Sequence, residues 1–100
     1  MDSDVFDIIL KQRLEKISST LKLKANEYAK VDRLYNFKRA GKILNQSPDQ
    51  ALIGMFMKHL VCVLDMVESD QDFPDEYIDE KVGDAINYLI LLEALLKERV

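Results

Sequence analysis

Three polar side chains interrupt the most apolar part of the chain. Glu80, Asp84 and Asn87 stand near the start of a segment, about Pro74 to Val100, that is otherwise rich in leucine and isoleucine. At about 100° per residue they fall within about 60° of one another on one side of a helix. Carboxylates one turn apart repel each other, and burying them costs more unless a cation or hydrogen bonds compensate. Something should therefore neutralise this set.

Three explanations of the carboxylate pair stay open. Acidic residues in the first turns of a helix complement its dipole, so Glu80 and Asp84 could be exposed there with no ligand. A divalent cation is a second explanation, and ligands that are all oxygen suit Mg²⁺, Mn²⁺ or Ca²⁺ better than Zn²⁺. An internal ion pair is the third. Its candidate basic partners are Lys24, Arg33, Lys38, Arg39 and Lys58.

The segment from Lys24 to Arg39 combines basic and aromatic side chains. Basic groups hold phosphates and aromatic rings stack on bases, which makes it the best candidate for a nucleotide-binding segment. The competing explanation is a solvated amphipathic connector whose aromatic residues pack inward. No glycine-rich phosphate-binding motif is present.

His59 and Cys62 are the remaining reactive side chains. His59 lies on an apolar stripe beside Phe56 and Val63, which favours a histidine of the core over a catalytic one. Cys62 follows three residues later and is expected to pack in the core as well. A single cysteine forms no internal disulfide and fits a reducing compartment.

The elements that position these residues are predicted to be helices. The chain of 100 residues has 48% hydrophobic and 32% charged residues with only three Gly and two Pro, and no segment alternates like a strand. We expect one all-α domain over residues 1–100, a compact helical bundle of three long helices and one short helix. The expected helices are about Ser3 to Tyr28, Arg33 to Leu44, Pro48 to Glu68 and Pro74 to Val100. The first has a weak point at Ser18, Ser19 and Thr20. Asp32 is expected to cap the second, and Ser47 with Gln50 forms a capping box at the start of the third.

Apolar stripes on these helices predict the core. The expected stripes are Phe6, Leu10, Leu14, Ile17, Leu21 and Tyr28 on the first helix, Phe37, Ala40 and Leu44 on the second, and Leu52, Met55, Phe56, His59, Val63 and Val67 on the third. The last helix is apolar nearly all round, so it should be surrounded by protein, including a partner chain. This predicts a homo-oligomer. Gly54, inside the third helix, would allow a close approach of another helix.

The net charge and the hydropathy of the chain limit the classes of partner that it is expected to bind. A net charge of −4 argues against duplex nucleic acid. The first seven residues are acidic, and no uninterrupted apolar run approaches the roughly 18 residues of a membrane span, so no signal peptide or membrane is expected. The predicted location is the cytoplasm.

Three stretches, Lys24 to Arg39, Ser47 to Met66 and Asp79 to Arg99, together resemble small phage and prophage proteins of unassigned role. They are also similar to the nucleotide-modification-associated and MazG-like families of all-α nucleotide pyrophosphohydrolases. The resemblance covers roughly three quarters of the chain and implies carboxylates on two helices that hold Mg²⁺ against a triphosphate. Glu80 and Asp84 resemble one carboxylate pair, and Asp65 with Glu68 stands for the other.

The acidic motif is incomplete, because those enzymes usually have three glutamates where this chain has Asp65 and Glu68. Glu80 and Asp84 are also four apart instead of three. The expected metal ligands are Glu80, Asp84 and Asp65. The expected nucleotide-binding residues are Lys24, Glu27, Tyr28, Arg33, Asn36, Lys38, Arg39, Asn87 and Tyr88.

Three functions follow as expectations. The first is a nucleotide-handling protein, at most a Mg²⁺-dependent nucleoside triphosphate pyrophosphohydrolase. The second is a non-catalytic phage protein in the host cytoplasm that sequesters a nucleotide signal or blocks a host defence protein. The third is a homo-oligomeric interaction domain.

Overall fold

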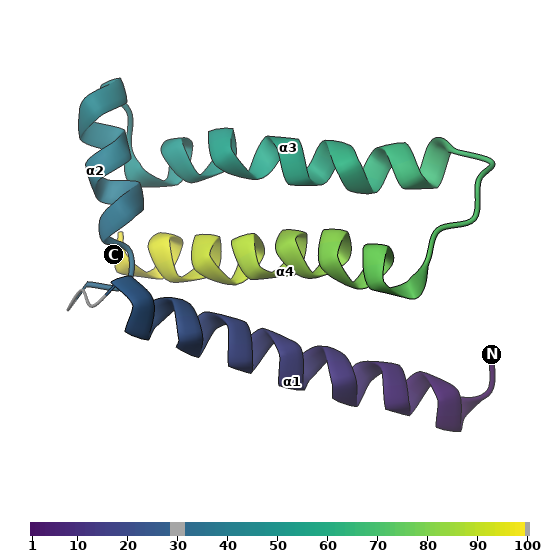
Figure 1. Ribbon diagram of the computed structural model, residues 1–100. Coiled ribbons are helices and arrows are strands. Elements are labelled where there is room, and N and C mark those ends of the chain that lie inside the picture. The colour runs from purple at the N-terminus through teal and green to yellow at the C-terminus, as the bar shows by residue number, and fades with distance from the viewer. Residues whose placement is uncertain (29–31, 100) are drawn as a thin grey trace. The chain divides into compact units, whose positions relative to one another are not determined.

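The regular structure of the chain is helical throughout the described residues (Figure 1). The computed structural model describes residues 1–28 and 32–99, without the side chains of residues 23–28. Its helices are α1 (Ser3–Tyr28), α2 (Tyr35–Leu44), α3 (Pro48–Glu68) and α4 (Asp75–Glu98). The prediction of an all-α fold is confirmed, and the helix lengths roughly match three long helices and one short one.

Two compact units make up the chain, Met1–Val31 and Asp32–Val100. The first consists of α1, which continues through Ser18, Ser19 and Thr20, so the predicted weak point there was wrong. Leucine and lysine, which favour helix, follow these hydroxyl residues and outweigh their competition for the backbone. On the predicted stripe of α1, Phe6 is 56% exposed and Leu14 is 58% exposed. The side chain of Tyr28 and the predicted connector 29–31 lie outside the described residues.

A short turn delays the start of α2 to Tyr35, two residues later than predicted. The Asp32 carboxylate accepts a hydrogen bond from the amide of Leu34, 2.9 Å away, and so closes this turn instead of capping the helix. At the other end, the amide of Gln46 donates to the Gly41 carbonyl at 2.8 Å. Asn45 takes the left-handed conformation with φ 56°. These two features form the Schellman ending of a helix.

The start of α3 is the best-predicted local feature. The Ser47 hydroxyl accepts from the amide of Gln50 at 3.3 Å, and the Gln50 side chain accepts from the amide of Ser47 at 3.1 Å. Pro48 occupies the first turn, and the helix ends at Glu68 as expected. The reciprocal bonds satisfy two amides that the helix itself leaves unpaired.

Helix α3 is also long and apolar enough to cross a membrane by length and composition. The expectation from the sequence did not name this segment, and the absence of a membrane stays a prediction. The expectation considered only uninterrupted apolar runs, whereas a few charged residues are compatible with a spanning composition. The core helix of a water-soluble protein passes the same test.

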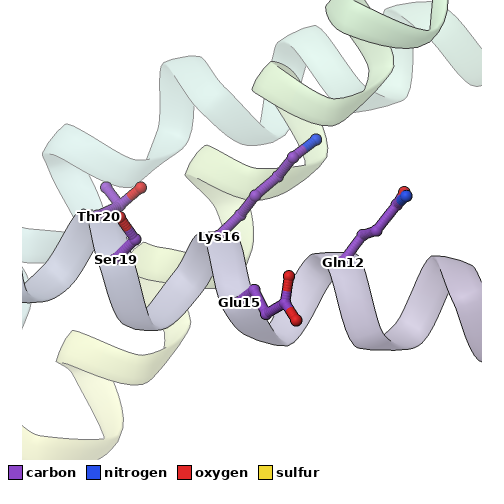
Figure 2. Close-up of a pocket in the computed structure, with 5 residues that line it drawn as sticks. All are labelled: Gln12, Glu15, Lys16, Ser19 and Thr20. Carbon is purple, nitrogen blue, oxygen red and sulfur yellow. The ribbon is translucent and has the colours of Figure 1, made fainter.

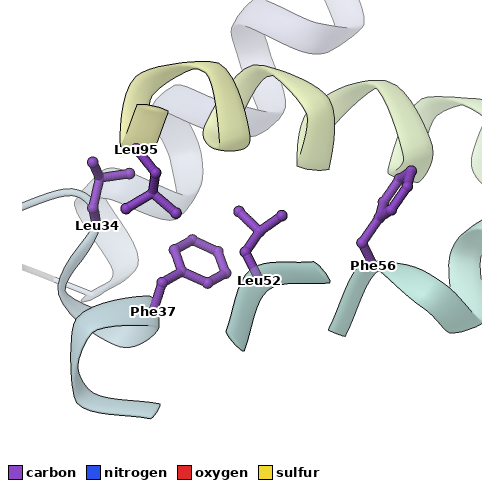
Figure 3. Close-up of a cluster of buried hydrophobic side chains, with 5 residues drawn as sticks. All are labelled: Leu34, Phe37, Leu52, Phe56 and Leu95. Atoms are coloured by element: carbon purple, nitrogen blue, oxygen red, sulfur yellow. The ribbon is translucent and has the colours of Figure 1, made fainter. Parts of the chain in front are cut away.

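The core of the second unit lies where α2, α3 and α4 meet (Figure 3). It consists of Leu34, Phe37, Leu52, Phe56 and Leu95, among which Leu52 has no exposed surface. Helices α3 and α4 pack against each other, and α2 packs against α3. Sequence reasoning found three of these five residues as members of stripes, and it described the last helix, which carries Leu95, as apolar nearly all round. It missed Leu34, which lies in the turn before α2.

Several predicted core positions are exposed. Leu44 is 59% exposed and Val67 is 77% exposed, because each lies in the last turn of its helix, where the chain leaves the packed region. The last helix is not surrounded by the described chain, since Leu89 and Leu96 are 51% and 43% exposed. It begins at Asp75 after Pro74 and ends at Glu98; Val100 lies outside the described residues.

Ion pairs join the ends of the helices in this unit. Lys38 on α2 forms ion pairs with Asp32, at 2.6 Å, and with Glu98 at the end of α4. Arg99 lies 3.2 Å from Asp49 in the first turn of α3. The C-terminal end of α4 is thus tied to both neighbouring helices.

We predict that Gly41→Ala destabilises the second unit. An added Cβ at Gly41 would lie 2.7 Å from the Gln46 carbonyl oxygen and 3.3 Å from the Pro48 nitrogen, both backbone atoms. The loss should be about 1–3 kcal/mol in the free energy of urea unfolding. Gly54→Ala is the matched control, because no described atom beyond its chain neighbours and its own helix backbone lies within 4 Å of its added Cβ. It should stabilise by about 1 kcal/mol, and equal effects of the two substitutions would contradict this account.

We also predict an acid-sensitive contribution from Asp32. The hydrogen bond from Lys38, followed by that from the amide of Leu34, lowers the pKa of Asp32 below its ordinary value of 3.8. The unfolded chain therefore binds the proton more readily, so this stabilisation is complete only above about pH 5. It is lost as the pH falls through the lowered pKa. NMR titration of the side-chain carboxyl carbons should show the pKa of Asp32 rising in Lys38→Met. Lys42→Met is the control, and the same titration should show the pKa of Asp32 unchanged in it.

Candidate functional site

The structure brings Asp84 of α4 against His59 of α3. The Nδ1 atom of His59 lies 3.5 Å from Oδ2 of Asp84, and the two side chains are 19% and 36% exposed. The ring of Tyr88 lies beside the imidazole, with 4.9 Å between the ring centroids. These three side chains form a polar cluster at the edge of the core. Sequence reasoning had named Asp84 and Tyr88 as site residues but had left His59 to the core.

The register of the two helices explains this meeting. From Leu52 to His59 on α3 is seven residues, and from Leu95 back to Tyr88 on α4 is also seven. Seven residues are about two helical turns, so both pairs face the same contact between the helices. Asp84 lies one turn before Tyr88 on the same side. No local pattern in the sequence gives this register, so the contact of His59 with Asp84 had no signal there.

Tyr88 connects the polar cluster to the core. Its ring packs at 6.0 Å from Phe56 and at 6.4 Å, nearly edge-on, from Phe37, measured between centroids. Such aromatic contacts fix the ring and therefore the position of the neighbouring imidazole. The cluster is consequently held by residues from all three helices of the unit.

Asn87, the neighbour of Tyr88, carries an unsatisfied acceptor. Its Oδ1 atom is shielded from solvent and has no hydrogen-bond partner among the described residues. A buried acceptor without a donor costs about 1–3 kcal/mol, so a native structure normally supplies one. Asn87 therefore provides an acceptor close to the cluster that a donor from outside the described chain could satisfy.

The three predicted metal ligands occupy different surroundings. Glu80 lies 3.6 Å from the Lys81 ammonium group, and Asp84 contacts His59. Asp65 is exposed on α3 and lies six residues beyond His59, about 9 Å along the helix axis. In the described part of the chain, no three His, Cys, Asp or Glu side chains gather into a group that could hold a metal. The metal stays a prediction.

Predicted nucleotide-binding residues on α2 lie toward the other end of α4. Lys38 pairs with Glu98, which is 14 residues beyond Asp84, or about 21 Å along the helix. Within one chain, Lys38 therefore does not reach Asp84. Arg33, Asn36 and Arg39 are exposed near Lys38. The side chains of Lys24, Glu27 and Tyr28 lie outside the described residues.

A shallow hollow on α1 is the other surface feature of note (Figure 2). The described residues that line it are Gln12, Glu15, Lys16, Ser19 and Thr20. All five come from one helix and spread along its surface. They share no pattern with the polar cluster of the second unit, and a single helix surface encloses no ligand.

The chain matches no protein-family model, and no curated protein or solved structure is detectably similar to it. The resemblance of Lys24–Arg39, Ser47–Met66 and Asp79–Arg99 to phage and MazG-like proteins therefore stays an expectation from the sequence. The case for a function depends on the residues themselves.

Proposed function

We propose that the chain binds a nucleotide or a nucleotide-derived small molecule at the polar cluster of His59, Asp84 and Tyr88. The observation that carries the proposal is the contact of Asp84 with His59 at 3.5 Å, beside the ring of Tyr88. Packing alone does not call for a carboxylate and an imidazole at the edge of an apolar helix pair, since apolar residues there would avoid the desolvation cost.

The chemistry of the cluster suits a nucleobase. The Asp84 carboxylate and the unpaired Oδ1 of Asn87 accept hydrogen bonds, as the exocyclic amines of bases require. The aromatic side of Tyr88 offers a surface for stacking. Lys81 lies one turn before Asp84 and supplies a positive charge for a phosphate.

A Mg²⁺ ion would extend this proposal to catalysis. Asp84 and Glu80 would be the residues that hold the ion, and it would supply neutralisation of phosphate charge for the hydrolysis of a triphosphate by water to a monophosphate and pyrophosphate. Without a metal, the same groups make a binder that sequesters a nucleotide, which is the non-catalytic phage protein expected from the sequence. Hydrolysis of the bound nucleotide distinguishes the enzyme from the non-catalytic binder.

We predict that a matching nucleotide raises the melting temperature of the protein. A ligand at a hundredfold excess over its Kd stabilises the folded state by about 2.7 kcal/mol. The measurement is a thermal-shift screen against linear and cyclic nucleotides, with and without Mg²⁺. Asp84→Asn and Tyr88→Leu should each remove most of the shift. The release of pyrophosphate is measured in the same way for the Glu80→Gln, Asp84→Asn double variant. A faster release by the unchanged chain would show that it is also a catalyst.

Tyr35→Leu is the matched control for Tyr88→Leu. Tyr35 is 42% exposed at the start of α2, a helix that supplies no residue to the proposed binding cluster, whereas the ring of Tyr77 lies under the Lys81 ammonium group. The control should keep the ligand-induced shift even if its own melting temperature changes. No shift with any nucleotide, or an equal loss in both variants, would contradict nucleotide binding at this cluster. A silent screen would favour a protein partner such as a host defence protein.

A second candidate function is a homo-oligomeric interaction domain. The exposed apolar side chains of α3 and α4 favour it, since Met57, Leu64 and Leu89 are 47%, 47% and 51% exposed. Complete burial of such a side chain contributes about 1.5–3 kcal/mol to the free energy of folding or association. Side chains that stay about half exposed gain only part of this stabilisation. An interface between copies would recover it.

We predict a mass above that of one chain of 11.6 kDa in solution. Light scattering after size exclusion, over a range of micromolar concentrations, measures it directly. A mass that rises with concentration toward a multiple of 11.6 kDa agrees with the candidate. A constant monomer mass contradicts it.

A further inference from the structure

The outer side of α3 carries an exposed apolar stripe. Ile53, Met57, Val61 and Leu64 are between 39% and 47% exposed. Their spacings of four, four and three residues place them along one side of the helix. Leu52 and Phe56, which are buried in the core, lie on the other side. The stripe is thus separate from the packing that holds α3 against α2 and α4 in the second unit.

Two opposite charges line one edge of the stripe. Lys58 and Asp65 are exposed and seven residues apart, which is about two turns, so they lie one above the other along the helix. Glu68 closes the stripe at the C-terminal end of α3. This edge therefore runs from positive to negative along the helix.

We propose that a second copy of this chain docks on the stripe, with the two α3 helices antiparallel about a two-fold axis near Val61. In an antiparallel pair related by such an axis, the same edge of both helices meets. Lys58 of each copy then faces Asp65 of the partner subunit, and Val61 and Leu64 of both copies pack around the axis. This inference rests on the homo-oligomer candidate and specifies its interface.

Charge complementarity selects this occupant. The charged edge is complementary to itself only in the antiparallel direction. In a parallel pair related by a two-fold axis, the Lys58–Asp65 edges of the two copies lie on opposite sides of the interface and do not meet. A foreign partner would give no reason for opposite charges on the two sides of Val61, three and four residues away from it. A lipid surface would gain nothing from Lys58 and Asp65 at the edge of the apolar stripe.

Charge reversal tests the proposal. Sedimentation velocity gives the dimer dissociation constant of the full chain and of Lys58→Glu, Asp65→Lys and the double reversal. Each single reversal places like charges together and should raise the dissociation constant by about tenfold or more. The double reversal restores opposite charges and should return it to within about threefold of the starting value. Circular dichroism checks that each variant stays helical.

The outcomes separate this inference from the candidate function. A dimer whose dissociation constant is unchanged in both single reversals would contradict the α3 interface. It would still agree with self-association through another surface. Failure of the double reversal to rescue the singles would overturn the antiparallel register. A monomeric chain would overturn both, and co-flotation of that monomer with phosphatidylcholine vesicles would assign the stripe to a lipid surface.

Discussion

The pairing of α3 with α4 in a fixed register is the constraint on which the second unit depends. It places Leu52 against the residues around Leu95 in the core, and two turns away it places His59 beside Tyr88. One packing arrangement therefore determines both the most buried residue and the polar cluster. A shift of one turn would remove the contact of His59 with Asp84 and would also unpack Leu52. Stability and the candidate site consequently depend on the same contact.

Local chemistry made much of this fold predictable. The capping box at Ser47 and Gln50 and the proline at position 48 each act within four residues, so the start of α3 follows from the sequence. The start of α2 was misplaced because the side chain of Asp32 serves equally well in a turn or in a cap. Only the hydrogen bond that forms in the folded chain decides between these two roles.

The candidate site was predictable only in part, and the reason is physical. Glu80, Asp84 and Asn87 stood out because they interrupt an apolar pattern within one helix. Their partner His59 belongs to another helix, and a periodic pattern carries no information about the register between helices. The same gap in information led Lys38 to be grouped with Asp84, although its ion pair with Glu98 places it toward the other end of α4.

Tyr88 has a consequence for how folding of this protein is observed. The chain contains no tryptophan and four tyrosines, so tyrosine dominates its near-ultraviolet spectrum. Tyr35 and Tyr77 are 42% and 37% exposed, whereas Tyr88 is partly buried and packs against Phe37, Phe56 and His59. Its phenol absorbs in an asymmetric surrounding that exists only when α2, α3 and α4 are assembled. Near-ultraviolet circular dichroism thus gives this helical unit a built-in optical reporter without an added label.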